Sequence, residues 1–493
     1  MSTGMPLAAL LDGIADAGAA GAIRIGGLSL DSRRVRAGEA FLALRGAHAH
    51  GIAFASAAVA RGAAAVLAES PAPAQLPVLP TTPVLWIGGL AAHAGTLAAR
   101  WYGEPSRALT VIGVTGTNGK TTTVQLLAQA LQQLGHRAAS IGTLGAGLHG
   151  QLTAGERTTP DAIAVHGLLA EFRDAGVSHV AMEVSSHALE QGRVNAVAFD
   201  LALFTNLTRD HLDYHNSMAA YAAAKSKLFA WPGLRVAVIN IDDGFGRDLA
   251  ARLPPGVRRL TTGIASADAD VRASAIRSSD AGLAFRLHTP WGDAEVSSAL
   301  LGRFNVANLL GVAAALGALG VDFGALRAAL ATLLPVPGRM SRLGGGAAPL
   351  VVVDYAHTPD ALEQALTALR AHCSGALICV FGCGGERDAG KRPEMGAIAA
   401  RQADRAIVTD DNPRGEDGDA IVAAILAGMP AGATVSVQRD RAAAIAAAVV
   451  MARPGDGVLI AGKGHEPYQE IAGARHPFDD LSVARAALKA RPC

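Results

Sequence analysis

The sequence is poor in cysteine and has no long apolar run. Its four cysteines, Cys373, Cys379, Cys383 and Cys493, lack Cys-x-x-Cys spacing, so we expect reduced thiols rather than a disulfide framework. No apolar run is long enough for a membrane span, and a formal net charge of +1 argues against nucleic-acid and membrane partners. The first residues include Asp12 and Asp16 but no basic leader, which predicts no signal peptide and a cytoplasmic location.

Lysine is also scarce. The chain has only six lysines, and arginine supplies the other strong positive charges. Alanine, glycine and arginine are abundant, as expected from a coding bias, so a lysine that remains can mark a position that arginine cannot serve. Unlike arginine, lysine is a compact point charge and can lose its proton. Four lysines lie in motif-like segments: Lys120, Lys225, Lys391 and Lys463.

The length predicts about three domains, because one hydrophobic core rarely serves 493 residues. Linker-like sequences at 103–106 and 335–338 give boundaries of 1–105, 106–336 and 337–493. In the last block, strand-like runs alternate with helical segments, which predicts a parallel sheet wrapped by helices. The expected strands are 350–353, 376–381, 405–409, 433–437 and 457–461.

A glycine-rich turn between a strand-like run and a helix is the clearest motif. The strand at 111–115 leads into Gly116-Thr-Asn-Gly-Lys-Thr-Thr122. Backbone N–H groups at such a helix N-terminus bind phosphate, Lys120 can reach the terminal phosphates, and the Thr121 hydroxyl can bind Mg²⁺. The strict P-loop pattern has a glycine where this chain has Val114, so Gly116 must supply the turn. The alternative is a tight turn without a ligand.

The middle block carries further acidic residues and histidines. Glu183 ends a buried strand at 179–182, the usual place for a Mg²⁺ ligand beside a P-loop. The segment 204–215 contains His211 and His215 among aspartates but has no nearby cysteine, so Mg²⁺ with phosphate contacts is preferred. We expect His215 at the surface, and Lys225, on a short amphipathic helix, would by itself also be assigned to the surface.

Polar clusters follow four strands of the last block. They cover residues 354–360, 382–388, 410–414 and 462–466. Open α/β sheets bind ligands at the carboxyl ends of their strands, so these clusters predict a ligand site. Arg387 stands where a dinucleotide fingerprint has its third glycine, which excludes that motif. The alternative for each cluster is a solvated turn.

Together these motifs identify a family. The chain resembles the Mur ligases of peptidoglycan synthesis over essentially its whole length, through the residues 116–122, 183–187, 205–211, 354–357 and 462–466. The resemblance implies an α/β fold of three domains. These are a UDP-sugar-binding domain (1–105), a central P-loop ATPase-like parallel-sheet domain (106–336) and a C-terminal Rossmann-like domain that binds an amino acid (337–493). It also implies an ATP- and Mg²⁺-dependent ligase that forms an acyl phosphate.

Within the family, residues 411–414 match the branch that adds meso-2,6-diaminopimelate, because lysine-adding relatives lack Arg414. The implied acceptor is UDP-N-acetylmuramoyl-L-alanyl-D-glutamate. The resemblance implies a monomer and the following catalytic residues: Lys120, Glu183, His211 and Lys225. The implied magnesium ligands are Thr121, Glu183, His211 and Lys225 as a carbamate. The implied nucleotide contacts are Gly116, Thr117, Asn118, Gly119, Lys120, Thr121, Thr122, Asn305, Arg339 and Asp354.

The resemblance also implies substrate contacts. Those for the UDP-sugar are Leu30, Ser32, Ala47, His48 and Ala49. Those for the muramoyl dipeptide are Thr158, Thr159, Ser185, Gln191 and Arg193. Those for diaminopimelate are Arg387, Asp411, Asn412, Pro413, Arg414, Gly462 and Glu466. The chain departs from the family pattern at Ser341, where many relatives have glutamate, and at Ala47, where a relative can have a polar residue.

Two other hypotheses stay open at this point. A folylpolyglutamate-synthetase-like ligase would share the P-loop but leave the first block unexplained. A binding protein that uses ATP only to hold a conformation would need fewer acidic residues and histidines than surround Glu183 and His211.

Overall fold

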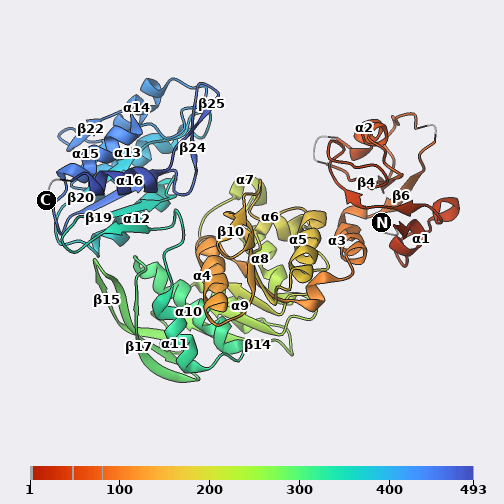
Figure 1. Ribbon diagram of the computed structural model, residues 1–493, viewed down its shortest axis with the longest axis horizontal. Helices are drawn as coiled ribbons and strands as arrows, with labels where there is room; N and C mark the ends of the chain where they lie inside the picture. The colour runs from red at the N-terminus through yellow and green to blue at the C-terminus, as the bar shows by residue number, and fades with distance from the viewer. Residues whose placement is uncertain (1–3, 47–48, 80, 492–493) are drawn as a thin grey trace. The chain divides into compact units, whose positions relative to one another are not determined.

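The computed structural model describes residues 4–46, 49–79 and 81–491 (Figure 1). The chain forms two compact units, residues 1–260 and 261–493. The three-domain division stays a prediction. Ala47 and His48, two of the expected UDP-sugar contacts, lie outside the described residues. In the part of the chain that is described, no helix is both long and apolar enough to cross a bilayer.

The first unit begins with a small four-stranded parallel sheet in the order β3-β4-β5-β6. Its strands are β3 (Leu28–Ser29), β4 (Ala40–Ala43), β5 (Ala65–Ser70) and β6 (Val84–Gly88). The antiparallel pair β1 (Met5–Pro6) and β2 (Arg24–Ile25) lies outside this sheet. The helices are α1 (Leu7–Leu10), α2 (Ala55–Ala60) and α3 (Leu90–Trp101). Leu42 and Leu67 are fully packed in its core.

A larger sheet follows in the order β10-β9-β8-β11-β7-β12-β13-β14. Its strands are β7 (Thr110–Thr115), β8 (Ala138–Gly142), β9 (Gly145–Leu148), β10 (Gln151–Thr153), β11 (His179–Glu183), β12 (Leu201–Phe204), β13 (Val236–Asn240) and β14 (Arg258–Gly263). Its helices are α4 (Lys120–Gln133), α5 (Ala162–Asp174), α6 (Ser186–Glu190), α7 (Leu212–His215), α8 (Met218–Ser226) and α9 (Gly244–Ala251). Since β7 lies between the parallel strands β11 and β12, the glycine-rich turn and Glu183 emerge at the same edge.

The second unit starts with an antiparallel meander and two helices. These are β15 (Val271–Ser279), β16 (Gly282–Thr289), β17 (Gly292–Ser298), α10 (Arg303–Ala318) and α11 (Phe323–Thr332). Next comes a six-stranded sheet, β18-β19-β23-β20-β21-β22, in which only β18 is antiparallel to its neighbour. Its strands are β18 (Ser341–Gly344), β19 (Leu350–Asp354), β20 (Leu377–Phe381), β21 (Arg405–Val408), β22 (Val435–Val437) and β23 (Gly457–Ala461).

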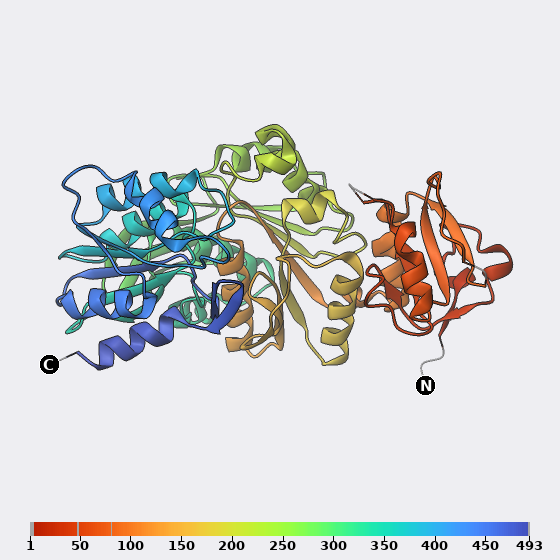
Figure 2. The same cartoon turned by 90° about the horizontal axis from the view of Figure 1, so that it is seen from above.

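Helices cover both faces of this second sheet (Figures 1 and 2). They are α12 (Pro359–Arg370), α13 (Lys391–Gln402), α14 (Gly418–Leu426), α15 (Arg441–Met451) and α16 (Asp480–Lys489), and a separate hairpin is formed by β24 (Tyr468–Ile471) and β25 (Ala474–Pro477). Alternate residues of each strand pack on opposite faces, so Cys379 meets α12 and α13 whereas Ile378 joins the cluster of α15 and α16. This double burial explains the continuous apolar runs in the sequence.

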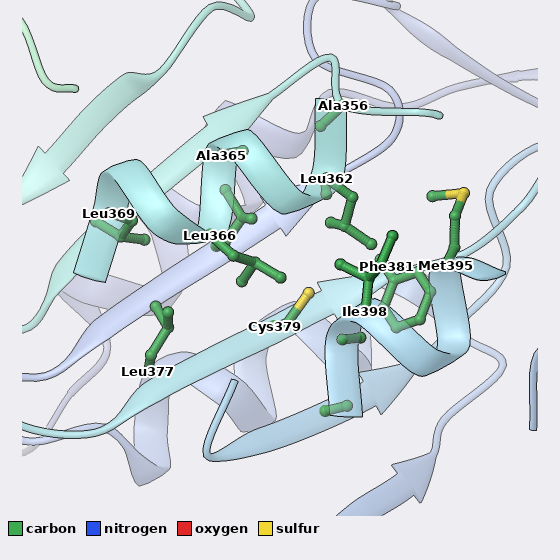
Figure 3. Packing of buried hydrophobic residues seen from close by; sticks show 14 of the residues in the cluster. Ala356, Leu362, Ala365, Leu366, Leu369, Leu377, Cys379, Phe381, Met395 and Ile398 are labelled. Carbon is green, nitrogen blue, oxygen red and sulfur yellow. The ribbon is translucent and has the colours of Figure 1, made fainter. Parts of the chain in front are cut away.

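The packing of α12 follows from its sequence. Leu362, Leu366 and Leu369 recur at helical spacing and point to the sheet, where they meet Leu377 and Phe381 (Figure 3). The helix begins at Pro359, whose fixed backbone suits the first turn, after the Thr358 side chain caps Ala361 N–H. Burying each such leucine stabilises the fold by about 2 kcal/mol.

The expected α/β class is therefore confirmed. All five strands expected in the last block are present, with ends that differ by at most two residues from the expected ones. Because these strands are parallel, their carboxyl ends place the four polar clusters along one edge of the sheet.

Candidate functional site

The glycine-rich turn after β7 has the geometry of a phosphate-binding loop. Gly116 (φ 147°) and Gly119 (φ 86°) occupy backbone regions that L side chains rarely adopt. A Cβ at Gly116 would lie 1.9 Å from Thr205 Oγ1, so the close approach requires glycine. The turn is held from the neighbouring strand, because Asn118 N–H donates to Asn206 Oδ1 (2.9 Å) and Thr205 Oγ1 donates to Asn118 O (2.6 Å).

Lys120 opens α4 and folds back over this loop. Its Nζ donates to Gly116 O (3.0 Å) and Thr117 O (2.8 Å). The ammonium therefore lies inside the curve of the loop, where an anion bound to the N-terminus of α4 would meet it. Thr117 in this turn and Thr122 in the first turn of α4 are both buried.

The Glu183 carboxylate lies at the end of β11, buried beside the N-terminus of α4. Thr121 Oγ1 donates to its Oε2 (3.0 Å), which brings together the two expected magnesium ligands of this strand and helix. Thr143 donates twice, from its backbone N–H to Oε1 (2.7 Å) and from its hydroxyl to Oε2 (3.2 Å). Sequence reasoning missed Thr143. The only signal available was its place directly after β8, the strand next to β11.

Lys225 is a residue that only the family resemblance places in the site. It is 1% exposed on α8, with Nζ 2.7 Å from Gly116 O and 4.3 Å from the centre of the Tyr221 ring. Burial, helped by the nearby Lys120 charge, lowers the pKa of the Lys225 ammonium from 10.5 to about 6. The surface location that its helix alone suggests is therefore wrong, and its amine is largely neutral at pH 7.

A histidine and tyrosine cluster lies next to Lys225. His211 is half exposed, has a left-handed backbone (φ 51°), and its ring centre lies 4.8 Å from that of His187 and 6.1 Å from that of Tyr221. His215 is buried with Nε2 3.0 Å from Ser186 Oγ, so its expected surface location is wrong. Burial lowers the pKa of both His187 and His215, with the His211 charge also acting on each. Tyr221, another residue that sequence reasoning missed, joins this cluster to Thr117 through its hydroxyl (3.2 Å).

The five residues expected at the muramoyl dipeptide form one network. Thr159 Oγ1 donates to the Glu183 backbone carbonyl (2.8 Å) and accepts from Ser185 N–H (3.2 Å). Arg193 donates to Gln191 Oε1 through Nε and NH2 and to Thr159 O through NH1 (3.0 Å). Thr143 and Thr158 are joined by a hydroxyl contact of 3.0 Å, which connects this network to the Glu183 carboxylate.

The expected UDP-sugar contacts that the structure describes lie in loops of the small sheet. Leu30 is half-buried and Ser32 is buried, both directly after β3. Ala49 accepts a hydrogen bond from Gly46 N–H (2.9 Å) in the loop after β4. Asp31 lies between Leu30 and Ser32 and pairs with Arg33 (2.8 Å), which lowers the pKa of the Asp31 carboxyl to about 2.

Three expected nucleotide contacts lie in the second unit. Asn305 is buried on α10 and donates to Leu301 O (2.7 Å). Asp354 ends β19 and accepts from Met340 N–H (2.7 Å); burial raises the pKa of its carboxyl, against the effect of the Arg339 guanidinium. Arg339 stacks on the Tyr355 ring (4.8 Å), and its buried Nε has no hydrogen-bond partner among the described residues. An unpartnered buried donor here fits an anionic ligand.

The residues expected at the amino-acid substrate meet at the carboxyl edge of the second sheet. Asn412 Nδ2 donates to Glu466 Oε2 (2.8 Å). Asp411 is buried beside them, and burial raises the pKa of its carboxyl despite the Arg441 and Lys463 charges. Gly462 (φ 120°) allows this approach, since a Cβ there would lie 2.2 Å from Asp411 Oδ2. Pro413 is buried in the same segment.

Arg414 lies at the rim of this cluster. Its NH1 donates to Gly385 O (2.7 Å), and its backbone is left-handed (φ 55°). The hairpin β24–β25 holds that backbone, because Arg414 N–H donates to Glu470 O (2.9 Å) and Ala472 N–H donates to Arg414 O (2.7 Å). Arg387 is exposed in the loop after β20. The two guanidinium groups thus come from loops after β21 and β20, neighbouring strands of the sheet.

The donors around Glu183 suit magnesium better than a softer metal. Hydroxyl and carboxylate oxygens, here from Thr121 and Glu183, are the ligands that Mg²⁺ prefers. Within residues 4–46, 49–79 and 81–491, no group of three or more His, Cys, Asp and Glu side chains is arranged to hold a metal ion.

The fold defines an α/β protein with a P-loop-like turn in its first unit and a Rossmann-like sheet in its second. Family models match residues 24–102 (Mur ligase family, catalytic domain), 114–316 (Mur ligase middle domain) and 338–464 (Mur ligase, glutamate ligase domain). The chain belongs to the Mur ligase family, and as such it is an ATP-dependent ligase.

Individual relatives agree along the whole chain. A UDP-N-acetylmuramoyl-L-alanyl-D-glutamate–2,6-diaminopimelate ligase of Xanthomonas campestris pv. campestris is 58% identical over 100% of this chain and 99% of its own. The ligase of the same name from Pseudomonas aeruginosa is 54% identical, covering 94% and 95%. A solved structure with that name superposes with a TM-score of 0.73 at 38% identity, over 99% of each chain.

Proposed function

We propose that the chain joins meso-2,6-diaminopimelate to UDP-N-acetylmuramoyl-L-alanyl-D-glutamate at the expense of ATP, in peptidoglycan precursor synthesis. The observation that carries this function is the full-length similarity to ligases of that name. The cluster of Asn412, Arg414 and Glu466 supports it, because the group has the charges that a zwitterionic amino acid requires.

The reaction has two steps. A carboxylate oxygen of the acceptor's D-glutamate attacks the γ-phosphorus of ATP, giving an acyl phosphate as the bond to ADP breaks. The diaminopimelate amine then attacks the acyl carbon and loses a proton, and inorganic phosphate leaves. Such transfers depend mainly on positioning and on neutralising charge.

The glycine-rich loop of the first unit both positions the phosphates and neutralises their charge. Its N–H groups and the N-terminus of α4 bind the phosphates, and Lys120, already folded over the loop, offsets the charge that develops on them. Thr121 and Glu183 would hold one Mg²⁺, and His211 with a carbamylated Lys225 a second, which would neutralise phosphate charge. Thr121 and Glu183 have the oxygen donors this requires.

Carbamylation of Lys225 is favoured by its surroundings. In this reaction the free amine attacks carbon dioxide and loses a proton, and a pKa of about 6 leaves most of the Lys225 side chain deprotonated at pH 7. The product is an anion, a group that can approach a metal. Arginine cannot take part in this chemistry, which explains a lysine at this position in an arginine-rich chain.

The amino-acid site accounts for the choice of substrate. Arg414 and Arg387 can bind the distal carboxylate of diaminopimelate. The Glu466 carboxylate can accept hydrogen bonds from an ammonium group of the same substrate. L-Lysine lacks that carboxylate and would leave the Arg414 guanidinium without its partner. Sites of this kind discriminate by roughly 10⁴-fold. The acceptor would contact the network around Arg193 and the loops of the small sheet.

Phosphate release from ATP tests the proposal. With UDP-N-acetylmuramoyl-L-alanyl-D-glutamate present, release is expected with meso-diaminopimelate and not with L-lysine. Release with lysine would keep the ligase but contradict the role given to Arg414. No release with either amino acid would contradict the proposed function.

A further inference from the structure

Lys463 is a fully buried cation that the proposed reaction leaves without a role. It follows β23 and is 0% exposed. Glycines with left-handed backbones flank it, Gly462 (φ 120°) and Gly464 (φ 56°), so the local chain path is built to turn this side chain inward. A buried ammonium is costly unless other groups compensate its charge and accept its hydrogen bonds.

Its partners are residues of the amino-acid site. Lys463 Nζ donates to Asn412 Oδ1 (2.9 Å) and to Glu466 Oε2 (3.2 Å). It also lies 5.5 Å from the centre of the Tyr468 ring. An ammonium has only donors, so both oxygens must act as acceptors.

The first contact determines how the Asn412 amide is oriented. Its Oδ1 accepts from Lys463 Nζ and from Glu470 N–H (2.9 Å). A reversed amide would place its NH₂ group against two donors and lose both bonds. The NH₂ group therefore points to Glu466 Oε2 (2.8 Å), with a second hydrogen to offer.

The second contact determines which carboxylate oxygen of Glu466 is left for a ligand. Lys463 and Asn412 both donate to Oε2. The other oxygen, Oε1, is then the one available to an ammonium group, on a side chain that is 22% exposed.

We propose that Lys463 is a positioning residue of the amino-acid site. It orients the Asn412 amide and the Glu466 carboxylate. The Asn412 N–H then faces the carboxylate group of the substrate, and Glu466 Oε1 faces its α-amino group. This inference rests on the proposed function, since it assigns Lys463 to the same site.

The test compares Lys463→Met, which keeps the chain length and removes the donors, with wild type. The KM for meso-diaminopimelate should rise about tenfold or more, while the KM for ATP stays within about twofold. Calorimetric binding of meso-diaminopimelate to the full chain should weaken by a similar factor. Lys489→Met, at an exposed position of α16, is the matched control and should change neither. A folded Lys463→Met protein with wild-type KM and affinity would overturn the proposal.

A double variant separates positioning from a general loss of structure. If Lys463 acts through Glu466, then adding Lys463→Met to Glu466→Gln should weaken binding little beyond Glu466→Gln alone. A structural role elsewhere would instead multiply the two losses, and that result would contradict the proposal.

A second variant serves if Lys463→Met does not fold. Asn412→Asp keeps an acceptor for Lys463 and Glu470 N–H but removes the donor toward Glu466. Its KM should rise like that of Lys463→Met, and a wild-type KM would overturn the proposal. Should wild type release no phosphate, calorimetry still decides: meso-diaminopimelate binding that Lys463→Met weakens supports the inference although the proposed function fails, and equal binding refutes it.

Discussion

Lys225 and Lys463 are both buried, but their surroundings differ. Lys225 contacts a backbone carbonyl and an aromatic ring and lies near another cation, so burial lowers its pKa to about 6. Lys463 has a carboxylate at 3.2 Å and an amide oxygen at 2.9 Å. Burial alone therefore does not determine what a lysine does; its partners do. The first is suited to react as a neutral amine, and the second to orient other side chains.

The largest expected effect on turnover comes from a permanent charge at Lys225. Lys225→Arg cannot be neutral or carbamylated, so we expect kcat to fall about 10³-fold with the fold intact. Lys225→Ala should also lose most turnover. Phosphate release and circular dichroism check both points, and near wild-type rates in either variant would exclude the carbamate.

Removing the guanidinium at the rim of the second site should have the next largest effect. Arg414→Ala should raise the KM for diaminopimelate about 100-fold and weaken discrimination against lysine, because the distal carboxylate loses a charged partner. The measurement is kcat/KM for both amino acids. An unchanged ratio would assign specificity to other residues.

A smaller effect on kcat is expected from removing the Thr143 hydroxyl, which donates a hydrogen bond to Glu183. Thr143→Val keeps the shape but loses the hydroxyl bonds to Glu183 and Thr158, so kcat should fall about tenfold and the Mg²⁺ requirement rise. Thr143→Ser keeps the hydroxyl and should behave like wild type. Titration of activity with Mg²⁺ distinguishes the two variants, and equal curves would contradict the role of Thr143.

The smallest effect concerns stability. Because the folded pKa of Lys225 is below its unfolded value of 10.5, the unfolded chain binds more protons between about pH 6 and 10.5. The free energy of unfolding therefore decreases as the pH falls through that window. In protein prepared with a free Lys225 amine, Lys225→Met should remove this loss and raise Tm by roughly 5 °C at pH 7. The gain should shrink toward pH 10, and a constant or negative difference would refute this explanation.

The sequence predicted most of the second sheet, because its strands are buried on both faces and produce uninterrupted apolar runs between polar clusters. It also predicted the glycine-rich loop and Glu183. The burial of Lys225 and His215 could not be predicted, since it comes from long-range packing that covers their short helices. Thr143 and Tyr221 were missed for a related reason: their partners lie 40 and 104 residues away in sequence. The cytoplasmic location and the monomeric state remain predictions.

The hairpin β24–β25 has a consequence for how selectivity can change. Its two-residue turn, Ala472 and Gly473, has positive φ at both positions, and one strand of it fixes the backbone of Arg414. The placement of this guanidinium is thus set by a small appendage rather than by the strands of the sheet. An insertion, deletion or proline in that turn would shift the preference for amino acids while leaving the hydrophobic core untouched. If Arg414 selects the amino acid as proposed, substrate choice can change here at little cost in folding.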